Sequence, residues 1–195
     1  MPERQLRVLS IFGTRPEAIK MAPVVERLVA TSGVESSVCV TAQHRQMLDQ
    51  VLDLFDIQPD YDLDIMRPDQ ALSELTAALF TDLDPVLQDA QPDWVLVQGD
   101  TTTVMAAALL AYYHQMRVGH VEAGLRTGDK WQPFPEEVNR RIAGAIADLH
   151  FAPTTQAREN LMHEGVPSER VIVTGNPVID ALQTIAARPY EFESG

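Results

Sequence analysis

Short apolar runs alternate with amphipathic segments along most of this chain. The first run, Leu6 to Phe12, is almost continuously apolar, ends at Gly13 and is followed by apolar residues at helical spacing up to Val29. This succession predicts a buried strand, a tight turn and a helix. The alternation continues to a last apolar run at Val171 to Val173. Because strands that alternate with helices pair in parallel through right-handed crossovers, we expect a doubly wound α/β sheet in three layers.

The same patterns give expected bounds for each element. Strands are predicted at residues 6–12, 38–41, 94–97, 117–121, 149–152 and 171–173, with a short extended piece at 61–65. Helices are predicted at 16–29, from about 43 to 55, and at 72–90, 104–113, 136–147 and 154–163. Glycine and proline residues mark most of the boundaries.

One stretch in the second half of the chain concentrates candidate chemistry. Arg117 to Val121 has the length and β-branched content of a buried strand, so Glu122 falls where that strand ends. Open α/β sheets bind their ligands at the carboxyl ends of their strands. A loop rich in glycine and proline follows, and Pro135 suits the first turn of a helix that opens with Glu136 and Glu137. The helix dipole favours the ionised form of both carboxylates.

Composition narrows the class of protein. At 195 residues, of which 45% are hydrophobic, the chain is large enough to bury the core of one ordinary domain. A single cysteine, Cys39, excludes an internal disulfide and fits a reducing cytosol. The sequence has no run of about eighteen apolar residues, the length that a membrane span requires. We therefore expect a cytoplasmic protein.

The net charge of −13 disfavours nucleic acid and anionic membranes as partners, because the field of the protein repels them. An anionic ligand must then depend on local basic clusters and helix N-termini, which Gly13 to Lys20 and Arg126 to Arg141 offer. In the first cluster, Arg15 lies beside backbone N–H groups suited to a phosphate, and Lys20 follows one helical turn after Pro16. Both residues are also explained as plain surface charges. The turn matches neither the dinucleotide-binding nor the NTP-binding glycine motif.

The candidate carboxylates also have structural interpretations. Asp100 follows a predicted strand, which suits an acid or base, but aspartate is equally typical of a helix N-cap. Glu122 neither caps nor begins a predicted helix, so a structural role explains it less well. Glu136 and Glu137 are typical of a first helical turn whatever their function. No grouping of residues has metal-ligand spacing, and no serine or cysteine nucleophile motif is present.

Seven segments, taken in order, resemble the non-hydrolysing bacterial UDP-N-acetylglucosamine 2-epimerases. They are FGTRPEAIKMAPV, VTAQHRQMLDQVL, VQGDTTTVMAAAL, HVEAGLRTGD, PFPEEVNRR, HFAPT and VTGNPVIDAL. The resemblance covers nearly the whole chain, from Val8 to Leu182. It implies a Rossmann-like domain that forms one half of a two-domain GT-B enzyme, with the nucleotide sugar bound between the two domains.

The resemblance also implies roles for individual residues. Asp100, Glu122 and Glu136 match the catalytic carboxylates of the family, and Arg15 and Lys20 match its substrate contacts, to which Asp100 and Glu122 also belong. The implied reaction interconverts UDP-GlcNAc and UDP-ManNAc by elimination and re-addition of UDP. Carboxylates would move the C2 proton, and positive groups would stabilise the departing diphosphate. No cofactor or metal is implied.

Chain length departs from the family pattern, because family members are about twice as long. Residues 1–175 are expected to form the N-terminal catalytic-carboxylate domain. Residues 176–195 are expected to form the linker into a C-terminal nucleotide-binding domain that this sequence lacks.

A second departure concerns regulation. Four residues match positions that hold a second, regulatory substrate molecule in some members: Gln43, His44, Gln46 and Gln70. Asp69, however, stands where those members have arginine, which argues against regulation by substrate.

These observations lead to one expectation and two alternatives. We expect an isomerase of cell-envelope polysaccharide synthesis that binds UDP-GlcNAc, UDP-ManNAc and UDP and is inactive as this isolated half. The resemblance implies that full-length members are homodimers. The alternatives are a non-catalytic association module from a split or degenerate epimerase and one half of a GT-B glycosyltransferase.

Overall fold

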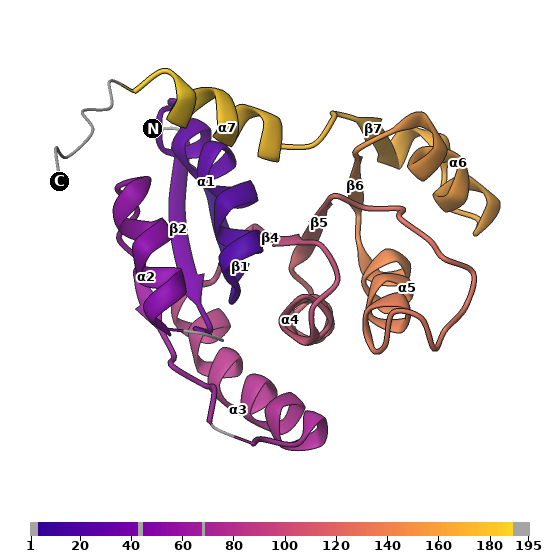
Figure 1. Cartoon of the computed structure of the whole chain (residues 1–195), viewed down its shortest axis with the longest axis horizontal. Helices are drawn as coiled ribbons and strands as arrows, with labels where there is room; N and C mark the ends of the chain where they lie inside the picture. Colours follow the sequence, from indigo (N-terminus) through magenta and orange to yellow (C-terminus); the bar gives the residue numbers. More distant parts are fainter. Residues whose placement is uncertain (1–3, 43–44, 68, 189–195) are drawn as a thin grey trace, which may run out of the picture.

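The structure, a computed structural model, describes residues 4–42, 45–67 and 69–188. It contains one sheet of seven parallel strands in the order β3-β2-β1-β4-β5-β6-β7 (Figure 1). The strands are β1 (Leu6–Phe12), β2 (Val34–Val40), β3 (Tyr61–Asp62), β4 (Trp94–Gln98), β5 (Arg117–Val121), β6 (Leu149–Ala152) and β7 (Val171–Val173).

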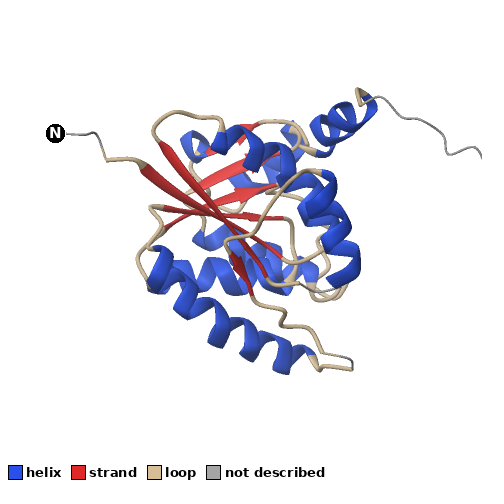
Figure 2. Cartoon of the chain, turned by 90° about the vertical axis from the view of Figure 1, so that its left-hand side faces the viewer, coloured by secondary structure: helices blue, strands red, loops and turns tan. Residues whose placement is uncertain are grey.

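Helices cover both faces of the sheet (Figure 2). They are α1 (Arg15–Val29), α2 (Arg45–Leu54), α3 (Leu72–Ala90), α4 (Thr102–Tyr113), α5 (Glu136–Ile146), α6 (Thr155–His163) and α7 (Val178–Ala186), with a 3-10 turn, η1, at Ser168–Arg170. One apolar core joins α1 and α2 to the sheet, and a second joins α3, α4 and α5 to its other face. The predicted Rossmann-like fold in three layers is confirmed.

Strand β1 shows why the central strands are apolar along their whole length. Leu9 and Ile11 enter the core under α3 and α4, whereas Val8 and Phe12 enter the core under α1 and α2. A strand buried on both faces has no polar side, so a continuous apolar run is the expected pattern. Helix α4 is apolar on nearly every side for the same reason, since it lies between the sheet and the neighbouring helices α3 and α5.

Strand β2 begins at Val34, four residues before its predicted start. Its first half carries the polar residues Glu35, Ser36 and Ser37, so the apolar pattern did not predict this part of the strand. Main-chain pairing with β1 nevertheless runs from Leu6 opposite Val34 to the ends of both strands. Backbone hydrogen bonding, not side-chain burial, therefore sets this boundary.

Residues after Gly175 return to the domain surface. Helix α7, which lies inside the predicted linker, packs along α1, as Figure 1 shows at the top of the view. Arg188, just beyond it, donates from Nη1 to the carbonyl of Leu54 at 2.5 Å and stacks over Phe55. The predicted domain boundary at residue 175 stays a prediction. Separately, none of the described helices is long and apolar enough to cross a bilayer.

Two buried imidazoles lie side by side in the sheet. His120 on β5 and His150 on β6 are register partners, and each is 1% exposed. The Nε2 atom of His120 lies 2.7 Å from the carbonyl of Gly99, which only accepts, so Nε2 carries the proton. Burial lowers the pKa of both histidines to about 4, although backbone hydrogen bonds with Gly99 and Ala147 act in the other direction.

The free energy of unfolding is therefore expected to fall as the pH is lowered from 7 to 5. The unfolded chain takes up a proton at His120 below pH 6.5, whereas the folded chain resists protonation down to about pH 4. More protons are bound in the unfolded state within this window, which favours unfolding. The loss from His120 alone should be about 2 kcal/mol between pH 7 and pH 5, as measured by urea denaturation.

A neutral substitution tests this assignment. His120→Gln should lose less unfolding free energy between the two pH values, because glutamine does not titrate. His163→Gln is the matched control, since that histidine is exposed at the end of α6. The same pH dependence in both variants would contradict the role of His120.

Candidate active site

Three turns meet at the carboxyl ends of β1, β4 and β5. The strand order reverses between β1 and β4, because β2 and β3 continue to one side and β5 to β7 to the other. Such a switch point leaves a crevice between the turns that follow the two central strands. Gly13 and Thr14 follow β1, residues 99–101 follow β4, and the loop from Glu122 to Pro135 follows β5.

Glu122 and Lys20, both predicted site residues, lie together. Lys20 Nζ donates to Glu122 Oε2 at 2.5 Å, and Gln98 Nε2 donates to the same oxygen at 2.6 Å. The backbone of Glu122 is left-handed, with a φ of 60°, which is uncommon for a residue that has a Cβ atom. Strain of this kind persists only where the surroundings enforce it, and it is concentrated at functional sites.

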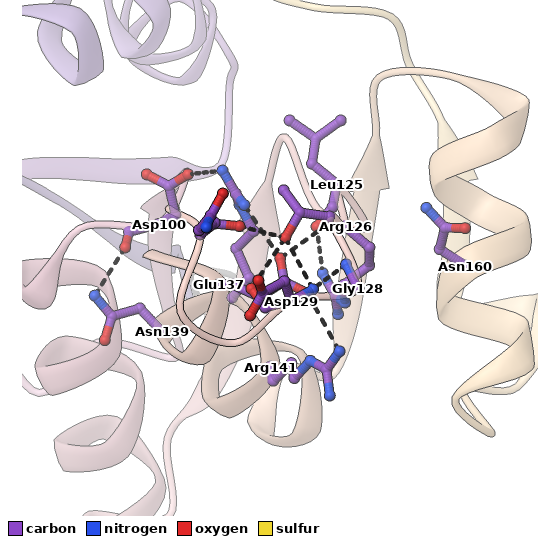
Figure 3. Close-up of polar contacts among 12 residues, drawn as sticks. Asp100, Leu125, Arg126, Gly128, Asp129, Glu137, Asn139, Arg141 and Asn160 are labelled. Carbon is purple, nitrogen blue, oxygen red and sulfur yellow. Dashed lines mark hydrogen bonds and ion pairs between the residues drawn. The ribbon is translucent and has the colours of Figure 1, made fainter. Parts of the chain in front are cut away.

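Asp100 does not cap a helix, which decides between its two interpretations. Thr101 is the N-cap of α4, and its hydroxyl accepts from the backbone N–H of Val104 at 3.4 Å. The Asp100 carboxylate instead accepts a hydrogen bond from Arg140 Nη2. Asn139, also on α5, donates from Nδ2 to the Asp100 carbonyl at 2.9 Å (Figure 3). Helix α5 therefore fixes both the main chain and the side chain of Asp100.

Glu137 is a structural anchor for the loop after β5. Its side chain is fully buried and accepts from the backbone N–H groups of Thr127 at 3.1 Å and Gly128 at 3.4 Å. Arg140 and Arg141 also donate to it, each at 3.3 Å. Burial alone would raise the pKa of Glu137, but these hydrogen bonds outweigh burial and lower the pKa. Glu137 thus stays ionised and holds the loop.

Glu136 has different surroundings although it precedes Glu137. It is the first residue of α5, and its Oε2 atom is enclosed without a hydrogen-bond partner in the described part of the chain. A buried acceptor normally has a partner, so this oxygen is suited to a donor from outside the chain. Within the described ranges, no three His, Cys, Asp or Glu side chains gather as metal ligands would.

The turn before α1 differs from the expectation that the backbone N–H groups beside Arg15 are free. The backbone N–H groups of Gly13 and Thr14 both donate to Glu17 Oε2, at 2.8 and 2.7 Å, and Glu17 N donates to Thr14 Oγ1 at 3.4 Å. Glu17 therefore occupies two of the donors that were expected to be free, those of Gly13 and Thr14. The Arg15 side chain is exposed and forms no hydrogen bond with the described residues, so its guanidinium can reach a ligand.

The basic cluster from Arg126 to Arg141 is also largely occupied, which corrects the expectation of a free anion-binding patch. Arg126 donates to both carboxylate oxygens of Glu164, at 2.8 and 2.7 Å. Arg140 and Arg141 are held by Glu137, and Arg140 also by Asp100. Internal carboxylates therefore neutralise most of the cluster: the pairs of Arg140 and Arg141 with Glu137 are local to α5, whereas the pairs of Arg126 with Glu164 and Arg140 with Asp100 depend on tertiary contacts.

Helix α6 holds the loop after β5 from its other side. Asn160 Nδ2 donates to the Gly124 carbonyl at 2.9 Å, and Figure 3 shows Asn160 projecting from α6 towards the loop. Gly124 has a φ of 89°, and a Cβ atom at this position would lie 2.2 Å from the carbonyl oxygen of Ala157. Only glycine permits so close an approach of two backbones.

The predicted regulatory residues are described only in part. Gln43 and His44 lie outside the described residues, as does the side chain of Gln46. Gln70 Oε1 accepts from the backbone N–H of Arg67 at 3.3 Å. A regulatory role for these four positions stays a prediction.

Comparison with known proteins identifies the family to which this chain belongs. The family model described as UDP-N-acetylglucosamine 2-epimerase matches residues 26–193. The chain belongs to this family.

Individual members of the epimerase family agree closely with the chain. The UDP-N-acetylglucosamine 2-epimerase of Yersinia pestis is 61% identical to this chain, and the match covers 91% of this chain and 47% of that protein. The putative UDP-N-acetylglucosamine 2-epimerase of Clostridium acetobutylicum is 58% identical, and the match covers 98% of this chain and 50% of that protein. The crystal structure of the Neisseria meningitidis enzyme bound to UDP-GlcNAc has a TM-score of 0.89 and 54% identity, covering 93% of this chain and 50% of that one. The chain therefore spans about half the length of the curated relatives it matches.

Three residues that shape the site of this epimerase-family chain were not predicted as site residues: Glu17, Asn139 and Arg140. Glu17 was detectable, because a threonine followed three positions later by glutamate is the signature of a capping box. Asn139 and Arg140 had no such signal. Their link to Asp100 depends on how α5 packs beside the β4–α4 turn.

Substitution of two glycines tests the contact between the loop and α6. Gly124→Ala and Gly128→Ala both place a side chain at a positive φ, 89° and 82° respectively, but only at Gly124 does the new methyl group meet an atom. Gly124→Ala should therefore lower the free energy of unfolding by at least about 2 kcal/mol more than Gly128→Ala does. Urea denaturation of the 195-residue chain measures both values, and equal losses would show that α6 does not fix the loop.

Proposed function

We propose that this chain supplies the catalytic-carboxylate half of a UDP-GlcNAc 2-epimerase, which interconverts UDP-GlcNAc and UDP-ManNAc. The observation that carries the proposal is the gathering of carboxylates at the switch point. Asp100 and Glu122 lie at the ends of adjacent strands, and Glu136 opens the helix whose residues hold Asp100. Strand ends of this kind are where such sheets bind ligands.

The proposed chemistry needs groups of this type. C2 of the sugar has no neighbouring carbonyl, so its proton is not acidic. A base removes that proton while the bond from C1 to UDP breaks, and the electrons form the C1=C2 double bond of a glycal. UDP then adds back to C1, and a proton is delivered to the opposite face of C2. Both steps balance without an oxidant or reductant, and carboxylates are suited to both proton transfers.

The cations beside the carboxylates support binding of a diphosphate. Lys20 pairs with Glu122, and Arg140 pairs with Asp100, while Arg15 is exposed at the start of α1. Charge-assisted hydrogen bonds to phosphate oxygens are strong, so the leaving group would draw these cations towards itself. Release from its cation would then leave each carboxylate free to exchange a proton with the sugar.

The second half of the family chain completes the proposed enzyme. The relatives are about twice as long, and the half of them that this chain does not span is proposed to bind the uridine and exclude water from the cleft. Binding of UDP-GlcNAc, UDP-ManNAc and UDP belongs to this complete form. A homodimer, a cytoplasmic location and a role in envelope polysaccharide synthesis stay predictions.

Proton exchange at C2 provides the test. The chain is assayed alone and joined to the second half of the Yersinia pestis relative, with UDP-GlcNAc in deuterated water, by NMR. We expect deuterium at C2 and UDP-ManNAc from the joined protein, and neither from the isolated chain. An inactive joined protein that is folded would favour a non-catalytic module, and transfer of the sugar to an added acceptor would favour a glycosyltransferase.

Within the joined protein, Glu122→Gln should lower turnover by roughly 10² to 10⁴, the usual contribution of a positioned acid or base. Glutamine has the same shape and can still accept from Lys20, so folding should be retained. Glu159→Gln, an exposed position on α6, serves as the control for the loss of one carboxylate. Turnover of the two variants is compared at saturating UDP-GlcNAc, and near-normal turnover by Glu122→Gln would assign Glu122 to structure.

A further inference from the structure

Glu17 is a buried carboxylate that the family resemblance leaves without a role. It lies in the first turn of α1 and is 3% exposed. Its two oxygens serve different parts of the chain. Oε2 accepts from the backbone N–H groups of Gly13 and Thr14, whereas Oε1 accepts from the hydroxyl of Thr101 at 2.6 Å. One side chain therefore joins the turn after β1 to the turn after β4.

Helix capping explains only half of this arrangement. A capping box requires the reciprocal bonds between Thr14 and Glu17, and these are formed at the protein surface in many helices. It requires neither burial of the carboxylate nor a third donor 84 positions away in the sequence. Burying a carboxylate is unfavourable unless hydrogen bonds compensate, so the bond from Thr101 indicates a further constraint on this position.

The partner of Glu17 is the residue that follows Asp100. The Thr101 hydroxyl donates to Glu17 and accepts from the backbone N–H of Val104, so a single hydroxyl links α1, the β4–α4 turn and the start of α4. Burial raises the pKa of Glu17, and the hydrogen bonds from Thr101, Gly13 and Thr14 act in the other direction. Hydrogen bonds therefore hold Asp100 from two sides. Thr101, the next residue in the chain, is bonded to Glu17 of α1, and the side chain and carbonyl of Asp100 are bonded to α5.

We propose that Glu17 is a positioning residue for the epimerase reaction, acting through Thr101 to hold Asp100 in register with Arg15 and Lys20 across the switch point. The inference rests on the proposed function, because it assigns the positioning to that reaction. Misplacement of a reacting group by about 1 Å can lower a rate by about 10²-fold, so a hydrogen bond outside the ligand site is sufficient to affect turnover.

Four variants of the joined two-domain protein test the proposal. Thr101→Val breaks the bond to Glu17, and Thr101→Ser keeps it. Glu17→Gln can keep the two backbone bonds through its amide oxygen but replaces the oxygen that accepts from Thr101 with an NH₂ group. We expect kcat to fall by roughly 10-fold to 100-fold in Thr101→Val and Glu17→Gln, with KM for UDP-GlcNAc within about 3-fold, and Thr101→Ser to restore normal kcat. The double variant should be no slower than the slower single variant.

Loss of the α4 cap requires its own control, because Thr101 also caps that helix. Asp148→Ala serves as the control, because Asp148 Oδ2 accepts from the backbone N–H of Val118 at 2.9 Å at the amino end of β5, the opposite edge of the sheet from the site. It should lower the thermal midpoint as Thr101→Val does but leave kcat unchanged. If Asp148→Ala slows turnover equally, or if Thr101→Val and Glu17→Gln multiply in the double variant, the proposal is overturned.

Hydrogen exchange in the 195-residue chain separates this inference from the proposed function. Glu17→Gln should increase amide exchange in residues 98–101 relative to the unsubstituted chain, with exchange in the centre of α4 unchanged. Unchanged exchange in residues 98–101 would overturn the positioning role whatever the activity. An inactive joined protein in which exchange increases as expected would instead overturn the epimerase function and, with it, the assignment of this link to catalysis.

Discussion

The parallel pairing of β1 with β4 is the constraint on which the site depends. Val8 lies opposite Trp94 and Ile11 opposite Val97, so the two strands end at the same level. The chain leaves these ends in opposite directions around the sheet, which opens the crevice between their turns. Pairing of β4 with β5, in register from Trp94 opposite Arg117, then brings a third turn to the same edge. Residues far apart in sequence thus meet because three strand ends are aligned.

Two kinds of carboxylate occupy this edge, and their surroundings separate them. Glu17 and Glu137 are buried and accept backbone N–H groups, so each holds a turn in a defined shape. Asp100 and Glu122 are partly exposed and pair with the side chains of Arg140 and Lys20, which can change partners. Main-chain donors are fixed by the fold, whereas long cationic side chains are mobile. Glu17 and Glu137 therefore supply rigidity, and the partly exposed Asp100 and Glu122 remain available for chemistry.

Most of the fold was predictable because its signals are local. Continuous apolar runs identified the central strands, and capping and proline residues marked the helices, so β1, β4 and β5 lie where they were expected. The polar start of β2 and the helix α7 escaped prediction because pairing with β1 and packing on α1 determine them. In the site, the strand end at Glu122 and the basic first turn with Lys20 were both apparent from the sequence pattern, and the two side chains lie in contact. The bond between Glu17 and Thr101 could not be predicted, because the two residues are 84 positions apart and meet only through the pairing of β1 with β4.

The internal ion pairs have a consequence for selectivity. Lys20 and Arg140 each have a carboxylate partner held within reach by the fold, and a tethered partner acts at a high effective concentration. A small free anion must compete with that partner for one cation at a time and gains little by displacing it. A larger ligand could contact both cations at once and offer hydroxyl donors to both carboxylates. Such a ligand would replace both ion pairs in a single binding event. In the proposed enzyme, discrimination against simple phosphate would thus arise from competition between partners within the site, before the shape of the sugar is tested.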